Sequence, residues 1–346
     1  MQSIYDLNMK MATDMLAEKG QKSYRAKQLF QWLYRKRVGS FQEMTDMPAS
    51  LLEDLAQEYS IEPVKEITRQ VAKDGTTKYL FQLADGSSVE TVLMHFHFGE
   101  SLCVTSQLGC NMGCTFCASG LLKKQRDLTA GEIVGQVMFV QKELDKIGKR
   151  VDNVVIMGTG EPFDNYDNVM RFCEIINSDL GLAIGARHIT ISTCGIVPRI
   201  KEFAKGHYQY NLAISLHAPN DALRRRLMPI DQVYPLDVLM DALHEYSEDN
   251  NRRITFEYIL LHGVNDTDAH AIELANLIRG MNAYVNLIPY NQVDENGYVS
   301  TNEKVALHFY DVLMKHGVKA TLRSKHGDDI DAACGQLRAK HEKGKL

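Results

Sequence analysis

From about residue 100 onward, short apolar or β-branched runs alternate with longer segments of helical periodicity. The runs are LCVTS, VDNVVIMG, HITIST, YNLAISLH, RITFEYILL, AYVNLIPY and KATLRS. The helical segments between them cover residues 129–145, 164–178, 235–248, 266–280 and 303–316. Strands that alternate with helices form a parallel sheet wrapped by the helices, so the sequence predicts an α/β fold, either a barrel or a doubly wound sheet. In both folds the functional residues sit at the carboxyl ends of the strands.

The first hundred residues follow a different pattern. Residues 1–60 are helical in pattern, with helices expected near 23–37 and 48–59. The runs KYLFQL and SVETVLMHF, which are bounded by KDG and ADG, predict hairpin strands. The chain therefore divides into a helical region (1–60), a β-hairpin connector (61–98) and a core (99–346).

Three properties of the whole chain indicate the cellular compartment in which it works. No apolar run reaches 18 residues, so a membrane span is not expected. The N-terminus lacks the apolar segment and cleavage site of a secretory signal, which predicts a cytoplasmic protein. The seven cysteines are odd in number and unevenly spread, which in a reducing compartment favours metal-binding or catalytic thiols over a disulfide framework.

Positive charge is concentrated locally although the net charge is -5. The segment KSYRAKQLFQWLYRKR, residues 22–37, holds six basic residues, no acid, and the aromatics Tyr24, Phe30, Trp32 and Tyr34. Further basic clusters are Lys123 and Lys124 with Arg126, Arg224 to Arg226, and the tail after Arg338. Such clusters can bind the phosphates of a nucleic acid, because under screening the charges within about 10 Å matter most. Solvated helix faces are the alternative interpretation.

Four of the cysteines fall in CVTSQLGCNMGCTFCASG, residues 103–120, and three of them, Cys110, Cys114 and Cys117, have the spacing C-x3-C-x2-C. A structural zinc site would need a fourth ligand nearby, and none is obvious. Three thiolates can instead hold a four-iron cluster and leave one iron open to a substrate. The spacing resembles that of the radical S-adenosylmethionine (SAM) superfamily, which implies one [4Fe-4S] cluster and SAM as cofactors. Zinc binding and unligated cysteines remain alternatives.

Polar residues follow several of the predicted strands. In VVIMGTGEP, Gly158 and Gly160 let the backbone approach a ligand, and Glu161 can accept hydrogen bonds from the ammonium of an amino acid. Polar residues at the later strand ends could each make ordinary local hydrogen bonds, but together they suggest one common ligand. The superfamily resemblance implies that SAM is bound by Gly160, Glu161, Ser192, Ser215, Leu216, His217 and Asn291.

Ordered blocks along nearly the whole chain carry a more specific resemblance. They are YRAKQLFQWLY, VETVLM, MGTGEPFDN, ARHITISTCGI, SLHAPND, RRLMPI, HGVND and GDDIDAACGQL. The chain resembles the RlmN family of dual-specificity RNA methyltransferases, whose near relatives are the Cfr methyltransferases. The resemblance implies a partial (β/α)6 TIM-like radical SAM barrel with an N-terminal helical, RNA-binding accessory domain. It also implies 23S rRNA and tRNA as partners, an electron donor such as flavodoxin and, by default, a monomer.

The same resemblance implies roles for two cysteines and one carboxylate. In the family, one SAM methylates the cysteine that matches Cys334, and a radical made from a second SAM takes a hydrogen atom from that methyl group. The resulting carbon radical adds to an adenine, and Glu90 matches the proposed proton acceptor. Cys103 then attacks the sulfur of Cys334, which releases the product and leaves a transient disulfide. Whether Glu90 or Cys103 removes the proton stays open, and a salt-bridged surface residue is the alternative for Glu90.

The sequence leaves other functions open. Methylation of adenine C2 is expected, because GARHIT and SLHAPND are more similar to RlmN than to Cfr, which methylates C8. The alternatives are Cfr-like C8 methylation, a radical SAM enzyme with a non-RNA substrate, and a zinc-stabilised RNA-binding protein without catalysis. Cys194 stands where many relatives have serine and is either redox-sensitive or simply packed, and Cys173 is expected in the core.

Overall fold

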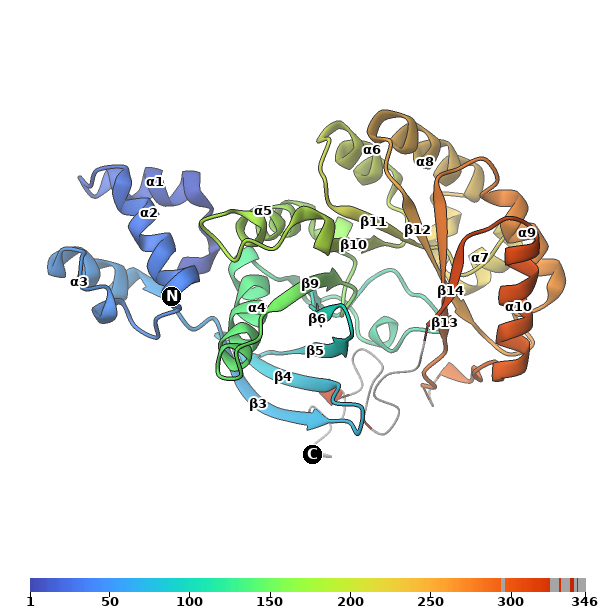
Figure 1. The fold of residues 1–346 in the computed structure, drawn as a ribbon, viewed down its shortest axis with the longest axis horizontal. Helices are drawn as coiled ribbons and strands as arrows, with labels where there is room; N and C mark the ends of the chain where they lie inside the picture. Colours follow the sequence, from blue (N-terminus) through green and yellow to red (C-terminus); the bar gives the residue numbers. More distant parts are fainter. Residues whose placement is uncertain (294–295, 324–329, 331–336, 339–340, 342–346) are drawn as a thin grey trace.

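The computed structural model describes residues 1–293, 296–323, 330, 337–338 and 341. Its central element is a sheet of ten strands in the order β14-β13-β12-β11-β10-β9-β6-β5-β4-β3 (Figure 1). Seven neighbouring strands are parallel: β6 (Gly99–Cys103), β9 (Val151–Ile156), β10 (Ile189–Thr193), β11 (Asn211–Ser215), β12 (Ile254–Leu260), β13 (Ala283–Pro289) and β14 (Ala320–Leu322). An antiparallel meander continues the sheet beyond β6: β5 (Ser88–Phe96), β4 (Thr77–Leu83) and β3 (Val64–Val71).

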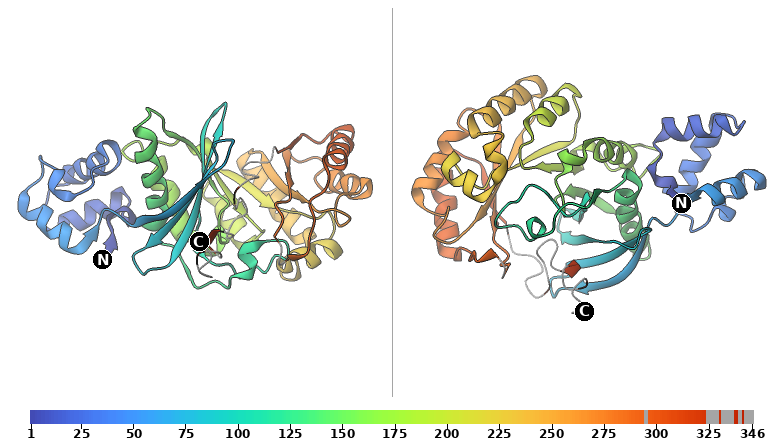
Figure 2. Two further views of the ribbon diagram at one scale, coloured as in Figure 1. Left: turned by 90° about the horizontal axis from the view of Figure 1, so that it is seen from below. Right: turned by 180° about the vertical axis from the view of Figure 1, so that it is seen from behind.

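Helices connect each parallel strand to the next and lie outside the sheet (Figures 1 and 2). They are α4 (Ala130–Asp145), α5 (Tyr166–Asn177), α6 (Val197–Lys205), α7 (Asp221–Leu227), α8 (Leu236–Asn250), α9 (Asp268–Leu277) and α10 (Glu303–Lys315). Because the strands follow one another in order across the sheet, all crossovers run the same way and cover one face, as right-handed βαβ units do. The fold is therefore the expected partial barrel of six strand–helix units, followed by β14, and not a doubly wound sheet. No helix in the described part of the chain is long and apolar enough to cross a membrane.

Strand β12 shows how side-chain alternation separates the core from the barrel interior. Its residues Ile254, Phe256 and Tyr258 are completely buried in the apolar core. The intervening Glu257 and Ile259 point the other way, toward the inside of the barrel, because successive strand side chains face opposite sides. One face of each parallel strand thus builds the core, and the other face can carry functional groups.

Strand β3 and helices α6 and α7 are among the observed elements that the sequence analysis does not predict. Strand β3 is at the edge of the sheet and carries Lys65 and Arg69, a charged composition that is common at sheet edges. Helices α6 and α7 have nine and seven residues, which is too short for a clear helical period. The region 61–98 is therefore a three-stranded meander of the core sheet rather than a simple hairpin.

The N-terminal region forms a helical body at one end of the molecule (Figures 1 and 2). It comprises α1 (Met9–Glu18), α2 (Tyr24–Phe30) with a following π-helical turn (Gln31–Lys36), and α3 (Ala49–Glu58), and a short β1 (Gln2–Ser3) pairs with β2 (Tyr59–Ser60). Phe30, Trp32 and Tyr34 are buried in this body, and of the four aromatics only Tyr24 is exposed. Three of the aromatics expected to suit RNA therefore belong to the helical core.

Hydrogen bonds fix the helical region to both ends of α4. Oδ1 of Asp6 accepts from the main-chain N–H of Gly131 at 2.6 Å, in the first turn of α4, where the helix dipole favours negative charge. At the other end of α4, Nη2 of Arg37 donates to Oδ1 of Asp145 at 2.8 Å. The helical region and the barrel are thus joined by direct polar contacts.

Candidate active site

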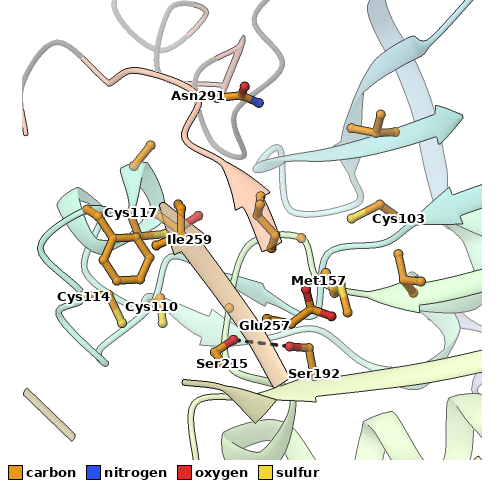
Figure 3. A pocket seen from close by; sticks show the side chains of 18 of the residues that line it. Cys103, Cys110, Cys114, Cys117, Met157, Ser192, Ser215, Glu257, Ile259 and Asn291 are labelled. Atoms are coloured by element: carbon orange, nitrogen blue, oxygen red, sulfur yellow. Dashed lines mark hydrogen bonds between the residues drawn. The ribbon is translucent and has the colours of Figure 1, made fainter. Parts of the chain in front are cut away.

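A cavity of about 360 Å³ lies at the carboxyl ends of the parallel strands (Figure 3). Its lining includes Cys103 (β6), Ser192 (β10), Ser215 (β11), Glu257 and Ile259 (β12), and residues that follow β9, β11, β13 and β14, namely Met157, His217, Asn291 and Arg323. Of the predicted SAM-binding residues, six line this cavity: Gly160, Glu161, Ser192, Ser215, His217 and Asn291. The seventh, Leu216, has its side chain completely buried in the apolar core. Six of the seven predicted residues therefore lie around one cavity, as expected for residues at the ends of parallel strands.

The three-cysteine loop is closed at its base by a short antiparallel pair, β7 (Gln107–Leu108) and β8 (Arg126–Asp127). Gly109 turns the chain with φ +78°, and a side chain there would place Cβ 2.2 Å from the main-chain oxygen of Lys123. The N–H of Cys110 donates to the main-chain oxygen of Leu122 at 2.9 Å. The loop therefore folds back on itself beside the cavity, and Cys110, Cys114 and Cys117 all line it (Figure 3).

The chemistry of these thiols suits a polynuclear cluster. Burial raises the pKa of Cys110 to about 12 and that of Cys114 well above its ordinary value, and neighbouring thiols add to both shifts. Thiolates at this place therefore need a cationic centre. Within the described residues, no three His, Cys, Asp or Glu side chains converge as ligands of a single ion. In an iron–sulfur cluster each thiolate binds a different iron, so the donor set fits a [4Fe-4S] cluster better than zinc.

The turn after β9 presents Glu161 to the cavity. Gly160 has φ +113°, and a Cβ there would lie 2.6 Å from Cβ of Gln107, so only glycine fits. Oε1 of Glu161 accepts from the N–H of Phe163 at 2.9 Å, and Oε2 accepts from the N–H of Cys194 at 2.8 Å. Burial raises the pKa of Glu161. The side chains of Thr193 and Cys194 also hydrogen-bond to this carboxyl group, so it is held in a fixed orientation where it lines the cavity.

Gln107 is a supporting residue that the sequence analysis missed. It is completely buried, and its Oε1 accepts from the N–H of Glu161 at 2.8 Å. Its Nε2 donates to Oδ2 of Asp164 at 2.9 Å. A single amide thus joins the base of the cysteine loop to the glutamate turn. No sequence signal marks it, because its partners become neighbours only in the folded chain.

His217 has a fixed tautomer at the end of β11. Its Nδ1 accepts from the main-chain N–H of Ile259 at 3.0 Å, so the ring proton is on Nε2. Burial, with a smaller contribution from the charge of Arg224, lowers the pKa of His217 to about 3. The ring packs edge-on against Phe116 with centroids 4.8 Å apart. His217 is therefore a neutral hydrogen-bond donor toward the cavity.

Glu90 is ion-paired but is not a surface residue. Only 4% of it is exposed, and its Oε2 is 2.9 Å from Nζ of Lys78, which is completely buried. Its Oε1 accepts from the main-chain N–H of Arg338 at 2.7 Å. On β5, Glu90 is two residues from Val92, which pairs with Cys103 on β6. Glu90 and Cys103 therefore face the same side of the sheet, the side of the cavity. Cys334 lies outside the described residues.

A second carboxylate in the cavity, Glu257, was not expected from the sequence. It is 4% exposed, and Nδ2 of Asn286 donates to its Oε2 at 2.7 Å. Burial raises the pKa of Glu257 to about 7. The available signal was an acidic residue inside the otherwise apolar run RITFEYILL, since buried carboxyl groups concentrate at functional sites.

Parts of the expected basic surface are structural instead. Arg224 is completely buried, where its Nη2 donates to the main-chain oxygen of Cys194 at 2.6 Å and its Nη1 is 3.2 Å from Oδ1 of Asp231. Arg126 pairs with Asp85 and Glu132, and Lys124 pairs with Asp127 and Asp164. The basic residues of these segments that stay exposed are Lys22, Lys27, Arg35, Lys36, Lys123, Arg225 and Arg226.

The two remaining cysteines are packed. Cys173 is completely buried on α5, as expected. Cys194 is 5% exposed beside the cavity, and its main-chain N–H and oxygen bond to Glu161 and Arg224. Burial raises the pKa of the Cys194 thiol well above its ordinary value, so it is a neutral, packed side chain.

Two family models match the chain. The model of the radical SAM superfamily matches residues 104–275, which include the cysteine loop and the glutamate turn. The model described as the ribosomal RNA large subunit methyltransferase N-terminal domain matches residues 2–61, the helical region. The two matches correspond to the two bodies of the structure.

Similar proteins span nearly the whole chain. A protein of Enterococcus faecalis named "Probable dual-specificity RNA methyltransferase RlmN" is 56% identical over 347 residues, covering 99% of this chain and 97% of that protein. A protein of the same name from Listeria monocytogenes is 56% identical and covers 99% of this chain and 94% of its own length. The crystal structure of a radical SAM methyltransferase from Sphaerobacter thermophilus has a TM-score of 0.93 and 42% identity, covering 97% of this chain and 99% of that chain.

Proposed function

This chain belongs to the RlmN family of radical SAM RNA methyltransferases, and from that premise we propose that it methylates adenine C2 in 23S rRNA and in tRNA. The observation that carries the proposal is one cavity lined by the three-cysteine loop, the Gly160–Glu161 turn and Cys103. Identity to proteins named RlmN extends over both the helical region and the barrel, so the catalytic and accessory parts are supported together.

Enzymes of this superfamily use one [4Fe-4S] cluster and SAM, and the residues of the cavity suit both. We propose Cys110, Cys114 and Cys117 as the cluster ligands. When bound, the cluster supplies the electron that splits SAM into methionine and a 5'-deoxyadenosyl radical. Glu161 accepts hydrogen bonds from the ammonium of the cofactor, and neutral His217 donates from Nε2. The remaining proposed SAM-binding residues are Gly160, Ser192, Ser215, Asn291 and, through main-chain atoms only, Leu216.

The chain's own residues carry the methyl group and then release it. Cys334 accepts a methyl group from one SAM and loses a hydrogen atom from it, after which that carbon bonds to adenine C2. Glu90 takes the proton from C2, and the ring gives up one electron, which the oxidised cluster would accept, so that the ring becomes aromatic again. The thiolate of Cys103 then attacks the sulfur of Cys334, so that an S–S bond forms and the S–C bond breaks. The freed carbon takes a proton and becomes the new methyl group.

We propose three functional regions. Residues 1–60 form the RNA-binding accessory domain, residues 61–98 the connector, and residues 99–346 the catalytic core that includes Cys334. The match of residues 2–61 to the N-terminal domain model and the exposed lysines of the helical region support this division. A base must leave its stack to enter a cavity inside the barrel. The proposed setting is a cytoplasmic monomer that receives electrons from a donor such as flavodoxin.

The test is anaerobic reconstitution with iron and sulfide, followed by incubation with methyl-labelled SAM, a reductant and RNA. We expect label on Cys334 in peptide mass spectra, release of 5'-deoxyadenosine, and a methyl group at adenine C2 in nucleoside digests. Label at C8 would assign the Cfr-like reaction. SAM cleavage that needs no RNA and leaves Cys334 unmodified would assign a non-RNA substrate, and bound zinc without iron or sulfide would exclude radical chemistry.

A further inference from the structure

Lys78 is an unusual lining residue of the cavity. It lies on β4, is completely buried, and shares its face of the sheet with Val92 on β5 and Cys103 on β6, since these three positions pair across the strands. Lysine is almost never fully buried unless its charge is paired. Its Nζ is 2.9 Å from Oε2 of Glu90, so the charge is paired with the proposed proton acceptor.

The other oxygen of Glu90 is also bound. Its Oε1 accepts from the main-chain N–H of Arg338 at 2.7 Å, and Leu337 and Arg338 are both buried. The carboxylate is thus held between an ammonium group from β4 and a main-chain donor from the C-terminal segment. Hydrogen bonds to a charged group are stronger than those between neutral groups. Because each oxygen of Glu90 has its own partner, the two bonds together fix the plane of the carboxylate.

We propose that Lys78 is a positioning residue for Glu90: its ammonium group orients the carboxylate to take the proton from the adenine carbon. This inference rests on the proposed function. In the step concerned, the proton moves from carbon to an oxygen of the carboxylate, and the ring gives up one electron as in the proposed function. Without the ammonium group, the carboxylate loses one of the two described contacts that fix its orientation.

Among the described residues, Lys78 from β4 and the main chain of Arg338 contact the carboxylate of Glu90, and Cys103 from β6 lies on the same face of the sheet. Glu257 and Arg323 line the cavity that Lys78 also lines. Within the described part of the chain, Lys78 is the cation whose side chain contacts this carboxylate, so its removal should act first on the orientation of Glu90.

The test compares Lys78→Met with the parent enzyme, reconstituted with the cluster and supplied with SAM and RNA. Methylation of Cys334 is measured by peptide mass spectrometry, and amounts of parent and variant that carry the same quantity of methylated Cys334 are compared. From these, the rate at which methylated RNA forms should be at least tenfold lower in Lys78→Met, because the carboxylate of Glu90 has lost the contact that orients it.

A second readout needs neither cluster nor SAM. In the cluster-free protein, hydrogen exchange of the Arg338 amide should be at least tenfold faster in Lys78→Met than in the parent, because the charge-assisted bond to Glu90 is weakened. Lys78→Arg, which keeps the positive charge, should restore both the rate of RNA methylation and the protection of this amide. Lys142→Met is the matched control, because Lys142 is a partly buried lysine that donates to the main-chain oxygen of Val38 and not to Glu90.

Two outcomes would overturn the inference. One is a Lys78→Met protein whose Arg338 amide exchanges at the rate of the parent, since Glu90 is then ordered without the ammonium group. The other is a defect that Lys78→Arg does not reverse. If the parent itself fails to methylate Cys334, the proposed function falls instead, and the exchange of the Arg338 amide still decides whether Lys78 orders Glu90.

Discussion

At the scale of single residues, the cavity side chains are oriented mainly by main-chain groups. Glu161 accepts from two backbone N–H groups, and His217 accepts from one. His217 also has φ +57°, a left-handed conformation that costs a non-glycine residue on the order of 1 kcal/mol or more. The bond from Ile259 fixes the ring in this conformation. The donor and acceptor directions are therefore set before a ligand binds.

Glu257 gives a pH-dependent prediction. Its pKa is raised from 4.5 to about 7 by burial, so the folded state holds the proton more tightly than the unfolded state does. Ionisation of Glu257 then opposes folding, with no cost below about pH 4.5 and the full cost above about pH 7. At about 1.4 kcal/mol per unit this amounts to about 3 kcal/mol. The free energy of unfolding of Glu257→Gln, relative to that of the parent, should therefore increase by about 3 kcal/mol from pH 5 to pH 8.

The measurement for Glu257 is urea unfolding of the cluster-free protein at both pH values. Glu248→Gln, at an exposed position of α8, is the control and should show no such change. If the free energies of unfolding of Glu257→Gln and the parent differed by the same amount at pH 5 and at pH 8, the raised pKa of Glu257 would be contradicted.

Cys103 gives a prediction on the order of chemical steps. Cys103→Ala should leave cluster binding intact and trap the protein covalently on RNA, because no thiolate then attacks the sulfur of Cys334. The adduct should appear as a shifted band on a denaturing gel that disappears on RNase treatment. If Cys103→Ala released free methylated RNA at the rate of the parent, Cys103 would not be the thiol that releases the product. Cys173→Ala, at a completely buried position on α5, is the control and should give no adduct.

At the scale of elements, the sequence predicts the parallel strands well because each carries an apolar face with period two. It also predicts where the strand-end residues gather, since parallel strands end on one side of the sheet. It misses Glu257, which is hidden in an apolar run, and Gln107, whose side-chain partners are 20 to 57 residues away. It misjudges Arg224 and the aromatics of residues 22–37, because composition does not say which side of a helix is buried.

Helix α4 gives a prediction about the attachment of the helical region. Asp6→Ala leaves the N–H of Gly131 without its acceptor inside a buried contact, which should lower the free energy of unfolding by about 2 kcal/mol. Asp14→Ala, which removes only an exposed ion pair with Lys10, should cost less than about 1 kcal/mol. Chemical unfolding curves measure both. Equal effects of the two changes would contradict a specific role for Asp6 at α4.

At the scale of the whole molecule, the site is built into the main sheet of the protein. The cysteine loop is closed by β7 and β8, and Gln107 joins it to the glutamate turn through buried hydrogen bonds. The cavity walls belong to one sheet of ten strands. The fold therefore does not depend on a metal in the way that a small zinc domain does.

Removal of the cluster gives the corresponding prediction. Chelation of iron should leave the far-UV circular dichroism unchanged and lower the melting temperature only as far as loss of a bound ligand requires. Cys110→Ala should abolish the iron and sulfide content while keeping the same circular dichroism spectrum. A full iron complement in Cys110→Ala would refute the ligand assignment, and loss of helix and strand signals on chelation would refute the independent scaffold.

The pairing of β5 with β6 has a further consequence. Val92 is opposite Cys103, and Glu90 stands two residues from Val92, so the main-chain repeat of the sheet determines how far apart Glu90 and Cys103 lie. A protein engineer could exchange either side chain for a different acid, base or nucleophile and retain the spacing without rebuilding the backbone. This wall of the barrel is thus a natural starting point for designing new reactions on nucleobases.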